Sequence, residues 1–127
     1  MRQFTVLLDN PEDSGGNDTG PMPTELFLTA LGGCYSSALA YFALKMRINI
    51  RTLRVTVSGF RSESPPRFTQ ITITAMPTVD EISEEKLARL SELAEKYCTV
   101  GNTIKNRTEI TVHVQSTLLS TQKEKTP

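Results

Sequence analysis

The residues best suited to carry chemistry in this 127-residue chain are its only two cysteines, Cys34 and Cys98. A thiolate is a nucleophile that can be oxidised, so two cysteines can form a redox pair if the fold brings them together. They stand about 64 positions apart and neither belongs to a C-x-x-C motif. What they can do therefore depends on the elements that position them.

Each cysteine also has a purely structural interpretation. Cys34 lies in an apolar helical segment, where a free cysteine commonly serves as a small buried hydrophobic residue. Cys98 is expected where a second helix ends and a Gly/Asn turn begins, so its thiol is expected to be partly exposed. Lys96 is near in sequence but points about 200° away on an ideal helix, so it is not expected to activate this thiol. Taken singly, both cysteines favour an inert role.

His113 is the only histidine, and it falls on the polar face of the last predicted strand, where a solvated position is expected. A Cys/Cys/His metal site fits the composition, but the three residues lack the close spacing of such sites. The signal for a metal site is therefore weak. A Cys–His hydrolase is also disfavoured, because no other nucleophile–base motif is visible.

Composition limits the protein to a few classes. The chain is long enough for one domain, expected at 1–115, followed by a polar tail at 116–127. Its 14 Lys and Arg balance its 14 Asp and Glu, which argues against nucleic acid as a partner. No secretory signal is recognised, so a cytoplasmic protein without a permanent disulfide is expected. The apolar stretch 26–44 is interpreted as a core helix rather than a membrane span.

Hydrophobic periodicity and turn residues predict an α+β fold with a mostly antiparallel sheet. The helix around Cys34 is apolar almost all round, so burial on most sides is expected. Gly32 and Gly33 each weaken it by about 1 kcal/mol relative to alanine, which points to a backbone or ligand close by. The expected elements are a strand at 4–8, a loop at 9–23, a helix from a Thr24 N-cap to about 45 or 47, strands at 50–60 and 68–74 joined as a hairpin, a helix from a Ser83 N-cap to Cys98, and a strand at 108–114.

Two motifs change the weight of these alternatives. GPMPTELFLTALGGC at 20–34 and EKYCTVGNTI at 95–104 resemble the two cysteine motifs of the OsmC/Ohr family, the osmotically induced and organic hydroperoxide resistance proteins. The segment PPRFTQI at 65–71 is similar to the middle of these proteins. The resemblance covers about 4–115 and is closest to the YhfA-like branch of the family.

The resemblance implies an α+β, OsmC-like fold that forms an intertwined homodimer around two long cysteine-bearing helices. It implies thiol-dependent reduction of organic hydroperoxides, in which Cys34 attacks the peroxide and becomes a sulfenic acid. Cys98 then closes a disulfide with it, and an external dithiol restores both thiols. The resemblance implies no metal and no organic cofactor. A lipophilic peroxide suits the apolar surroundings of Cys34 better than hydrogen peroxide does.

The resemblance also implies a glutamate and an arginine that hold the reactive thiolate. Glu25 is the acid of the PTEL segment, and an ideal helix places it about 180° from Cys34, so it reaches that sulfur only from a distorted first turn or from the other subunit. The arginine is not identified by position. Arg2 precedes the helix, and the other candidates are Arg47, Arg61 and Arg67.

Two functions follow. The first is a thiol-dependent hydroperoxide reductase that uses Cys34 and Cys98. The second is a non-catalytic or redox-sensing dimer that binds a small apolar ligand beside Cys34. An arginine within hydrogen-bonding reach of Cys34 favours the enzyme, whereas apolar surroundings favour the binding protein.

Overall fold

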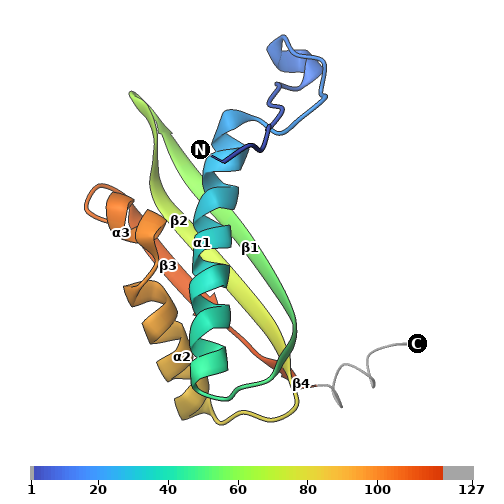
Figure 1. Cartoon of the computed structure of the whole chain (residues 1–127). Coiled ribbons are helices and arrows are strands. Elements are labelled where there is room, and N and C mark those ends of the chain that lie inside the picture. Colours follow the sequence, from blue (N-terminus) through green and yellow to red (C-terminus); the bar gives the residue numbers. More distant parts are fainter. Residues whose placement is uncertain (1, 119–127) are drawn as a thin grey trace.

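The computed structural model describes residues 2–118, which form a mixed sheet with helices packed against it (Figure 1). The α+β class predicted from the sequence is confirmed. The elements in chain order are the 3₁₀ turn η1 (Glu12–Ser14), α1 (Pro23–Lys45), β1 (Ile50–Glu63), β2 (Pro66–Val79), α2 (Glu84–Lys96), α3 (Thr99–Ile104), β3 (Glu109–Val114) and β4 (Thr117–Leu118).

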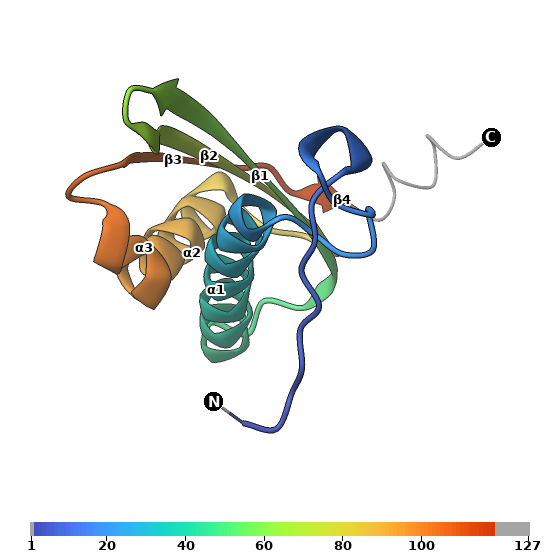
Figure 2. The same cartoon turned by 90° about the horizontal axis from the view of Figure 1, so that it is seen from above.

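The sheet has the order β1-β2-β3, and β4 pairs with the end of β2. β1 and β2 form the predicted antiparallel hairpin, which is the longest pairing, whereas β3 and β4 run parallel to β2. The helices all lie on one side of the sheet, and the other side is uncovered (Figure 2). Threonines and other polar side chains alternate with apolar ones along the strands, so the polar set faces solvent on the uncovered side.

β2 extends beyond the predicted end at residue 74, although it contains Pro77, which cannot donate a backbone hydrogen bond. The carbonyl of Ala75 accepts the N–H of Gln115, so the backbone polar groups of Ala75 point towards β3. Successive residues of a strand direct their backbone polar groups to opposite neighbours, so the backbone nitrogen of Pro77, two residues after Ala75, faces the same side. It faces the interruption between β3 and β4, where a ladder hydrogen bond is not required.

α1 begins at Pro23, one residue before the predicted Thr24 N-cap, and Met22 is the N-cap. The Glu25 carboxylate accepts the Met22 N–H at 2.8 Å, and proline at the first helical position loses no helical hydrogen bond. The helix ends at Lys45, Met46 is its C-cap, and Arg47 follows with a φ of 58°. By length and composition alone α1 could cross a membrane, but this is weak evidence because a core helix of a soluble protein passes the same test.

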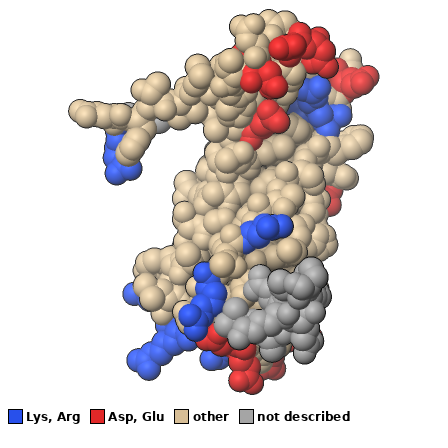
Figure 3. All heavy atoms as spheres, turned by 90° about the vertical axis from the view of Figure 1, so that its right-hand side faces the viewer, with Lys and Arg blue, Asp and Glu red and all other residues tan. Residues whose placement is uncertain are grey.

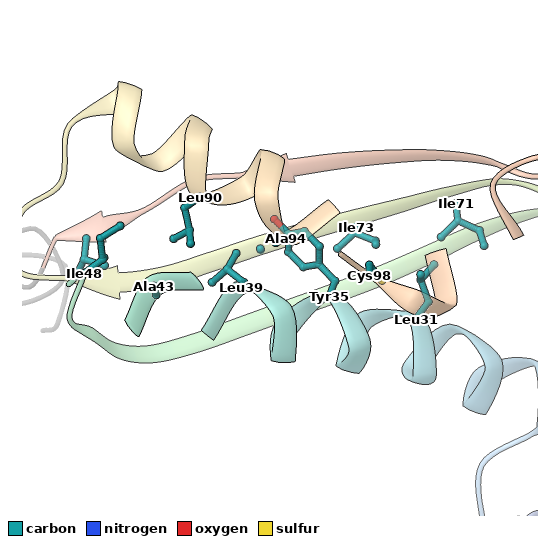
Figure 4. Packing of buried hydrophobic residues seen from close by; sticks show 12 residues of the cluster. Leu31, Tyr35, Leu39, Ala43, Ile48, Ile71, Ile73, Leu90, Ala94 and Cys98 are labelled. Carbon is teal, nitrogen blue, oxygen red and sulfur yellow. The ribbon is translucent and has the colours of Figure 1, made fainter. Parts of the chain in front are cut away.

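One face of α1 forms the centre of the core. The buried residues of that face are Leu31, Tyr35, Leu39 and Ala43. They pack on Ile71 and Ile73 of β2 and on Leu90 and Ala94 of α2 (Figure 4). The opposite face is exposed, so within one subunit α1 is not buried on most sides. The exposed residues of that face are Ala30, Gly33, Ser37, Ala40, Tyr41 and Leu44.

The N-terminal segment differs from its prediction, because residues 4–8 pair with no strand of the described chain and form an exposed arm that projects from the body (Figure 2). Asp9, at the base of this arm, organises the following loop. Its carboxylate accepts the N–H of Asn17 and both the N–H and the hydroxyl of Thr19. The Asp9 carboxylate also accepts the N–H of Asn10. These hydrogen bonds, the one from the Thr19 hydroxyl foremost, lower the pKa of Asp9 to about 2.

Charge is distributed unevenly around this framework. Figure 3 shows acidic side chains gathered at the end of the molecule that carries the loop, while the middle of the same side is largely uncharged. The polar tail expected at 116–127 lies largely outside the described residues, which end at Leu118.

Candidate functional site

Cys34 lies near the middle of α1, at the border between the buried face and the exposed face. Its side chain is half-buried and packs against the core cluster. Gly33, immediately before it, has nothing within 4 Å of the position where a Cβ would stand. The sulfur therefore lies beside an uncrowded stretch of helix surface.

Cys98 is buried, with 3% of its surface exposed, so the expected partial exposure is wrong for the single subunit. The segment 99–104, predicted as a turn, is the short helix α3, and Cys98 is its N-cap. The Cys98 Sγ accepts the Gly101 N–H at 3.4 Å. A Cβ on Gly101 would stand 3.3 Å from this sulfur, so glycine leaves room for the thiol.

The fold brings the two cysteines together. α3 packs against α1, which carries Cys34, and Cys98 lies among the buried residues between these helices and the sheet (Figure 4). Cys34 packs against the same cluster of buried residues. Both are free thiols, and Cys34 lies close enough to Cys98 to affect the pKa of Cys98. Burial raises the pKa of Cys98, and the contact with Cys34 raises it further, while the Gly101 N–H opposes both effects.

A tyrosine and a glutamate, neither of them singled out from the sequence, complete the surroundings of Cys98. The Tyr35 hydroxyl lies 3.0 Å from the Ser91 hydroxyl inside the protein. Burial raises the pKa of Tyr35, and it also raises that of Glu95, with a further contribution from Glu92. Tyr35 directly follows Cys34, and Glu95 is the first residue of the motif that contains Cys98, so nearness in the sequence was the available signal for both.

A cavity of about 730 Å³ opens between α2, α3 and β3, and Cys98 lines it. Its apolar wall consists of Leu31, Ile73, Ile110 and Val112. Its charged lining residues are Glu92, Glu95, Lys96, Lys105 and Glu109. Cys34 is not among the lining residues, so the two sulfurs face different surroundings.

Glu25 lies away from Cys34 within the subunit. Its carboxylate caps α1, and it lines a separate cavity of about 570 Å³ between α1 and β1, together with Gly32 and Val57. A Cβ on Gly32 would stand 2.5 Å from the Val57 side chain, so a strand passes close to this glycine, as predicted. Glu25 is thus in place to stabilise the start of α1.

Of the candidate arginines, Arg61 and Arg67 lie nearest the start of α1. They line a cavity of about 330 Å³ with Phe27, which stacks on Phe68 at 5.8 Å between ring centroids. Phe27 precedes Cys34 by two helical turns on nearly the same face. The Arg67 guanidinium donates to the carbonyl of Arg107.

Arg47 and Arg2 lie elsewhere. Arg47 follows Cys34 by 13 residues, which is about 20 Å along a helix axis. Arg2 lies over the Phe4 ring, 4.9 Å from its centroid, on the N-terminal arm. Neither is brought to Cys34 within one subunit.

His113 is exposed on β3, paired with Thr74, and lies apart from both cysteines in the sheet. Within residues 2–118, no group of three His, Cys, Asp or Glu side chains is arranged to hold a metal ion. The candidate functional site is therefore the pair of thiols, Cys34 and Cys98.

The sequence matches the family described as OsmC-like protein over residues 15–113. Protein YhfA of Escherichia coli (strain K12) is 32% identical over 101 residues, which are 78% of this chain and 75% of that protein.

Solved structures share the fold. The crystal structure of OsmC like protein from Mycoplasma pneumoniae has a TM-score of 0.76 at 23% identity, covering 92% of this chain and 84% of that one. The Organic Hydroperoxide Resistance Protein OhrB of Bacillus subtilis has a TM-score of 0.60 at 22% identity, covering 88% and 82%.

Proposed function

The chain belongs to the OsmC-like protein family, and on that premise we propose that it reduces organic hydroperoxides with the thiols of Cys34 and Cys98. The observation that carries the proposal is that two free thiols from separate helical segments lie near each other, because α3 packs against α1. A fold that places its only two cysteines side by side is suited to two-electron chemistry between them. The name of the Bacillus subtilis relative, an organic hydroperoxide resistance protein, supports the same chemistry.

In the proposed cycle the Cys34 thiolate attacks one oxygen of the peroxide and breaks the O–O bond. The leaving alkoxide takes a proton and departs as an alcohol, and Cys34 becomes a sulfenic acid. The Cys98 thiolate attacks the Cys34 sulfur, hydroxide leaves and becomes water, and a disulfide remains. A dithiol returns two electrons and restores both thiols.

The half-buried position of Cys34 suits this first step, because Cys98 lies deeper and is less accessible to a substrate. Apolar side chains on nearly the same helix face, Phe27 and Tyr41, offer contacts to an alkyl peroxide, which hydrogen peroxide cannot use. The substrate class in this proposal is therefore a lipophilic hydroperoxide.

The proposed active protein is a homodimer joined through the exposed face of α1. Small residues along that face allow two helices to approach closely, and Gly33 has no neighbour in its own subunit that requires a glycine. A helix of the partner subunit packed against this face would account for the glycine at position 33. Glu25 and an arginine, with Arg61 the candidate, would then reach the reactive thiol of the other subunit rather than their own.

The alternative is a non-catalytic or redox-sensing dimer that binds a small apolar ligand near Cys34. Burial raises the pKa of Cys98, which disfavours the attacking thiolate, and this favours the alternative. No arginine is a hydrogen-bond donor to either thiol within residues 2–118. A cytoplasmic location, where thiols stay reduced, fits both functions.

The experiment that separates them counts free thiols after the reduced protein is mixed with cumene hydroperoxide. The wild type is expected to lose two thiols rapidly and to release cumyl alcohol. Cys34→Ser is expected to lose none, and Cys98→Ser is expected to stop at a sulfenic acid on Cys34. Peroxide loss no faster than with dithiothreitol alone, together with intact thiols, would exclude the reductase and leave the binding protein.

A further inference from the structure

The two sulfurs of the pair face different sides of the subunit. Cys34 lies at the margin of the exposed face of α1, and it does not line the cavity between α2, α3 and β3. Cys98 does line that cavity, as does Gly101, whose N–H the Cys98 sulfur accepts. A molecule in the cavity therefore approaches the 3% of the Cys98 surface that is exposed, and it does not approach Cys34.

We propose that this cavity binds the external thiol reductant and directs it to the Cys98 sulfur, while the peroxide reaches Cys34 from the α1 face. The inference rests on the proposed function, because it requires that a Cys34–Cys98 disulfide forms. It assigns a separate binding site to the second half of the cycle.

The cavity lining indicates the class of reductant. Its volume of about 730 Å³ lies in the range that holds small organic ligands. Leu31, Ile73, Ile110 and Val112 form an apolar wall. The charged residues of the lining are Glu92, Glu95, Glu109, Lys96 and Lys105, so neither sign of charge dominates strongly. The ligand that fits is a small dithiol with a short aliphatic body and a polar, uncharged end.

The step balances as ordinary thiol–disulfide exchange. The thiolate of the reductant attacks the Cys98 sulfur, the bond between the two cysteines breaks, and Cys34 leaves as a thiolate. The second thiol of the reductant then attacks the mixed disulfide and releases Cys98, so two electrons pass to the protein. The two protons of the dithiol go to the two cysteines, and the reductant leaves as a cyclic disulfide.

The surroundings of Cys98 favour this direction of attack. Burial raises the pKa of Cys98, and a thiol with a high pKa is a poor leaving group. Attack on the Cys98 sulfur avoids expelling it in the first step. Attack on Cys34 would require Cys98 to leave as a buried thiolate.

Val112 and Val114 provide a matched pair of variants to test the site. Both are half-buried valines on the same face of β3, but only Val112 lines the cavity. The disulfide is prepared with diamide, so that no peroxidase activity is needed, and its reduction by dithiothreitol is timed. Val112→Phe is expected to slow reduction at least about tenfold, equivalent to a barrier change of about 1.4 kcal/mol, while Val114→Phe leaves it unchanged.

Two further readouts make the result decisive. Peroxide oxidation of reduced Val112→Phe is expected to stay close to the wild-type rate. Acid-quenched adducts of the oxidised protein with 2-mercaptoethanol, mapped by mass spectrometry, are expected on Cys98. Equal reduction rates in both variants, an adduct on Cys34, or failure of diamide to join the two cysteines would overturn the inference. Absence of peroxide turnover with normal diamide results would instead overturn only the proposed function.

Discussion

Reactivity at the scale of single residues follows from what surrounds each sulfur. Cys34 has an uncrowded neighbour in Gly33, whereas Cys98 is enclosed and caps α3 through a bond from Gly101. The enclosure raises the pKa of Cys98 above its ordinary value of 9.0. Because only the thiolate attacks a sulfenic acid, closure of the disulfide is the step that this burial slows.

The pH dependence of disulfide closure tests this assignment. The thiolate fraction of Cys98 increases about tenfold per pH unit below its pKa, so the closure rate is expected to increase in the same proportion from pH 7 to beyond pH 9. Intact-mass analysis of acid-quenched samples after a single addition of cumene hydroperoxide measures this rate. The Cys34→Ser variant, in which Cys98 is the only thiol, provides the control through its ultraviolet thiolate absorbance. A rate that is constant above pH 8 would contradict the raised pKa.

The sequence motifs predict that the two cysteines act together, and the structure brings the two helices that carry them into contact. Their joint action stays a prediction. The motifs were not sufficient to predict the burial of Cys98, because its surroundings come from α1 and β2, far away in the chain. The role of Glu25 as a cap could have been inferred from its position three residues after Met22. Its reach to Cys34 depends on a second subunit and stays a prediction.

At the scale of elements, the fit of α1 against β1 depends on Gly32. The position of a Cβ at Gly32 lies 2.5 Å from Val57, while the same atom at Gly33 meets nothing. The two adjacent glycines therefore have different reasons to be glycine, although the sequence alone treats them alike.

Alanine at these two positions separates their roles. Gly32→Ala is expected to destabilise the subunit by about 1–3 kcal/mol, because the added methyl overpacks a close helix–strand contact. Gly33→Ala gains helix propensity without a clash, so it is expected to be neutral or up to about 1 kcal/mol more stable. Urea denaturation at low protein concentration measures both. Equal stabilities of the two variants would show that β1 does not constrain Gly32.

Several element boundaries could be predicted, and others could not. Alternating side chains predicted the hairpin of β1 and β2, and Ser83 caps α2 as expected. The predicted strand at 68–74 is shorter than β2, which continues through Pro77 to Val79. A proline is tolerated in a strand where no partner needs its missing N–H, and the sequence does not show where such a gap in the sheet lies. The apolar residues at 4–8 alternate less clearly, and the described chain provides no strand to pair with them.

At the scale of the whole molecule, the exposed face of α1 is the largest unexplained feature of the single subunit. Leu44 is 79% exposed and Tyr41 54% exposed, in line with the small residues Ala30, Gly33 and Ser37. Burying such a face against a second copy removes apolar surface from water, which is the main favourable term in association. A twofold pairing of the same face is the simplest assembly that does so.

A charge in this face tests the dimer. Ala40→Glu is expected to convert the protein to a monomer, because the carboxylate would be buried without a partner between two helices. Ala88→Glu places the same change on an exposed position of α2 and is expected to leave the assembly intact. Sedimentation velocity measures both masses. A wild-type protein that sediments as a monomer would refute the interface, as would an Ala40→Glu variant that remains a dimer.

The central place of β2 also determines how the molecule comes apart. β2 is the strand with partners on both edges along most of its length, and Ile71, Ile73 and Ala75 are its buried residues beneath the helices. Exposing its backbone amides to solvent requires β1, β3 and α1 to separate together, which amounts to global unfolding. α3 is a helix of six residues that packs against α1. The thiol pair therefore joins this short helix to the part of the protein that opens last.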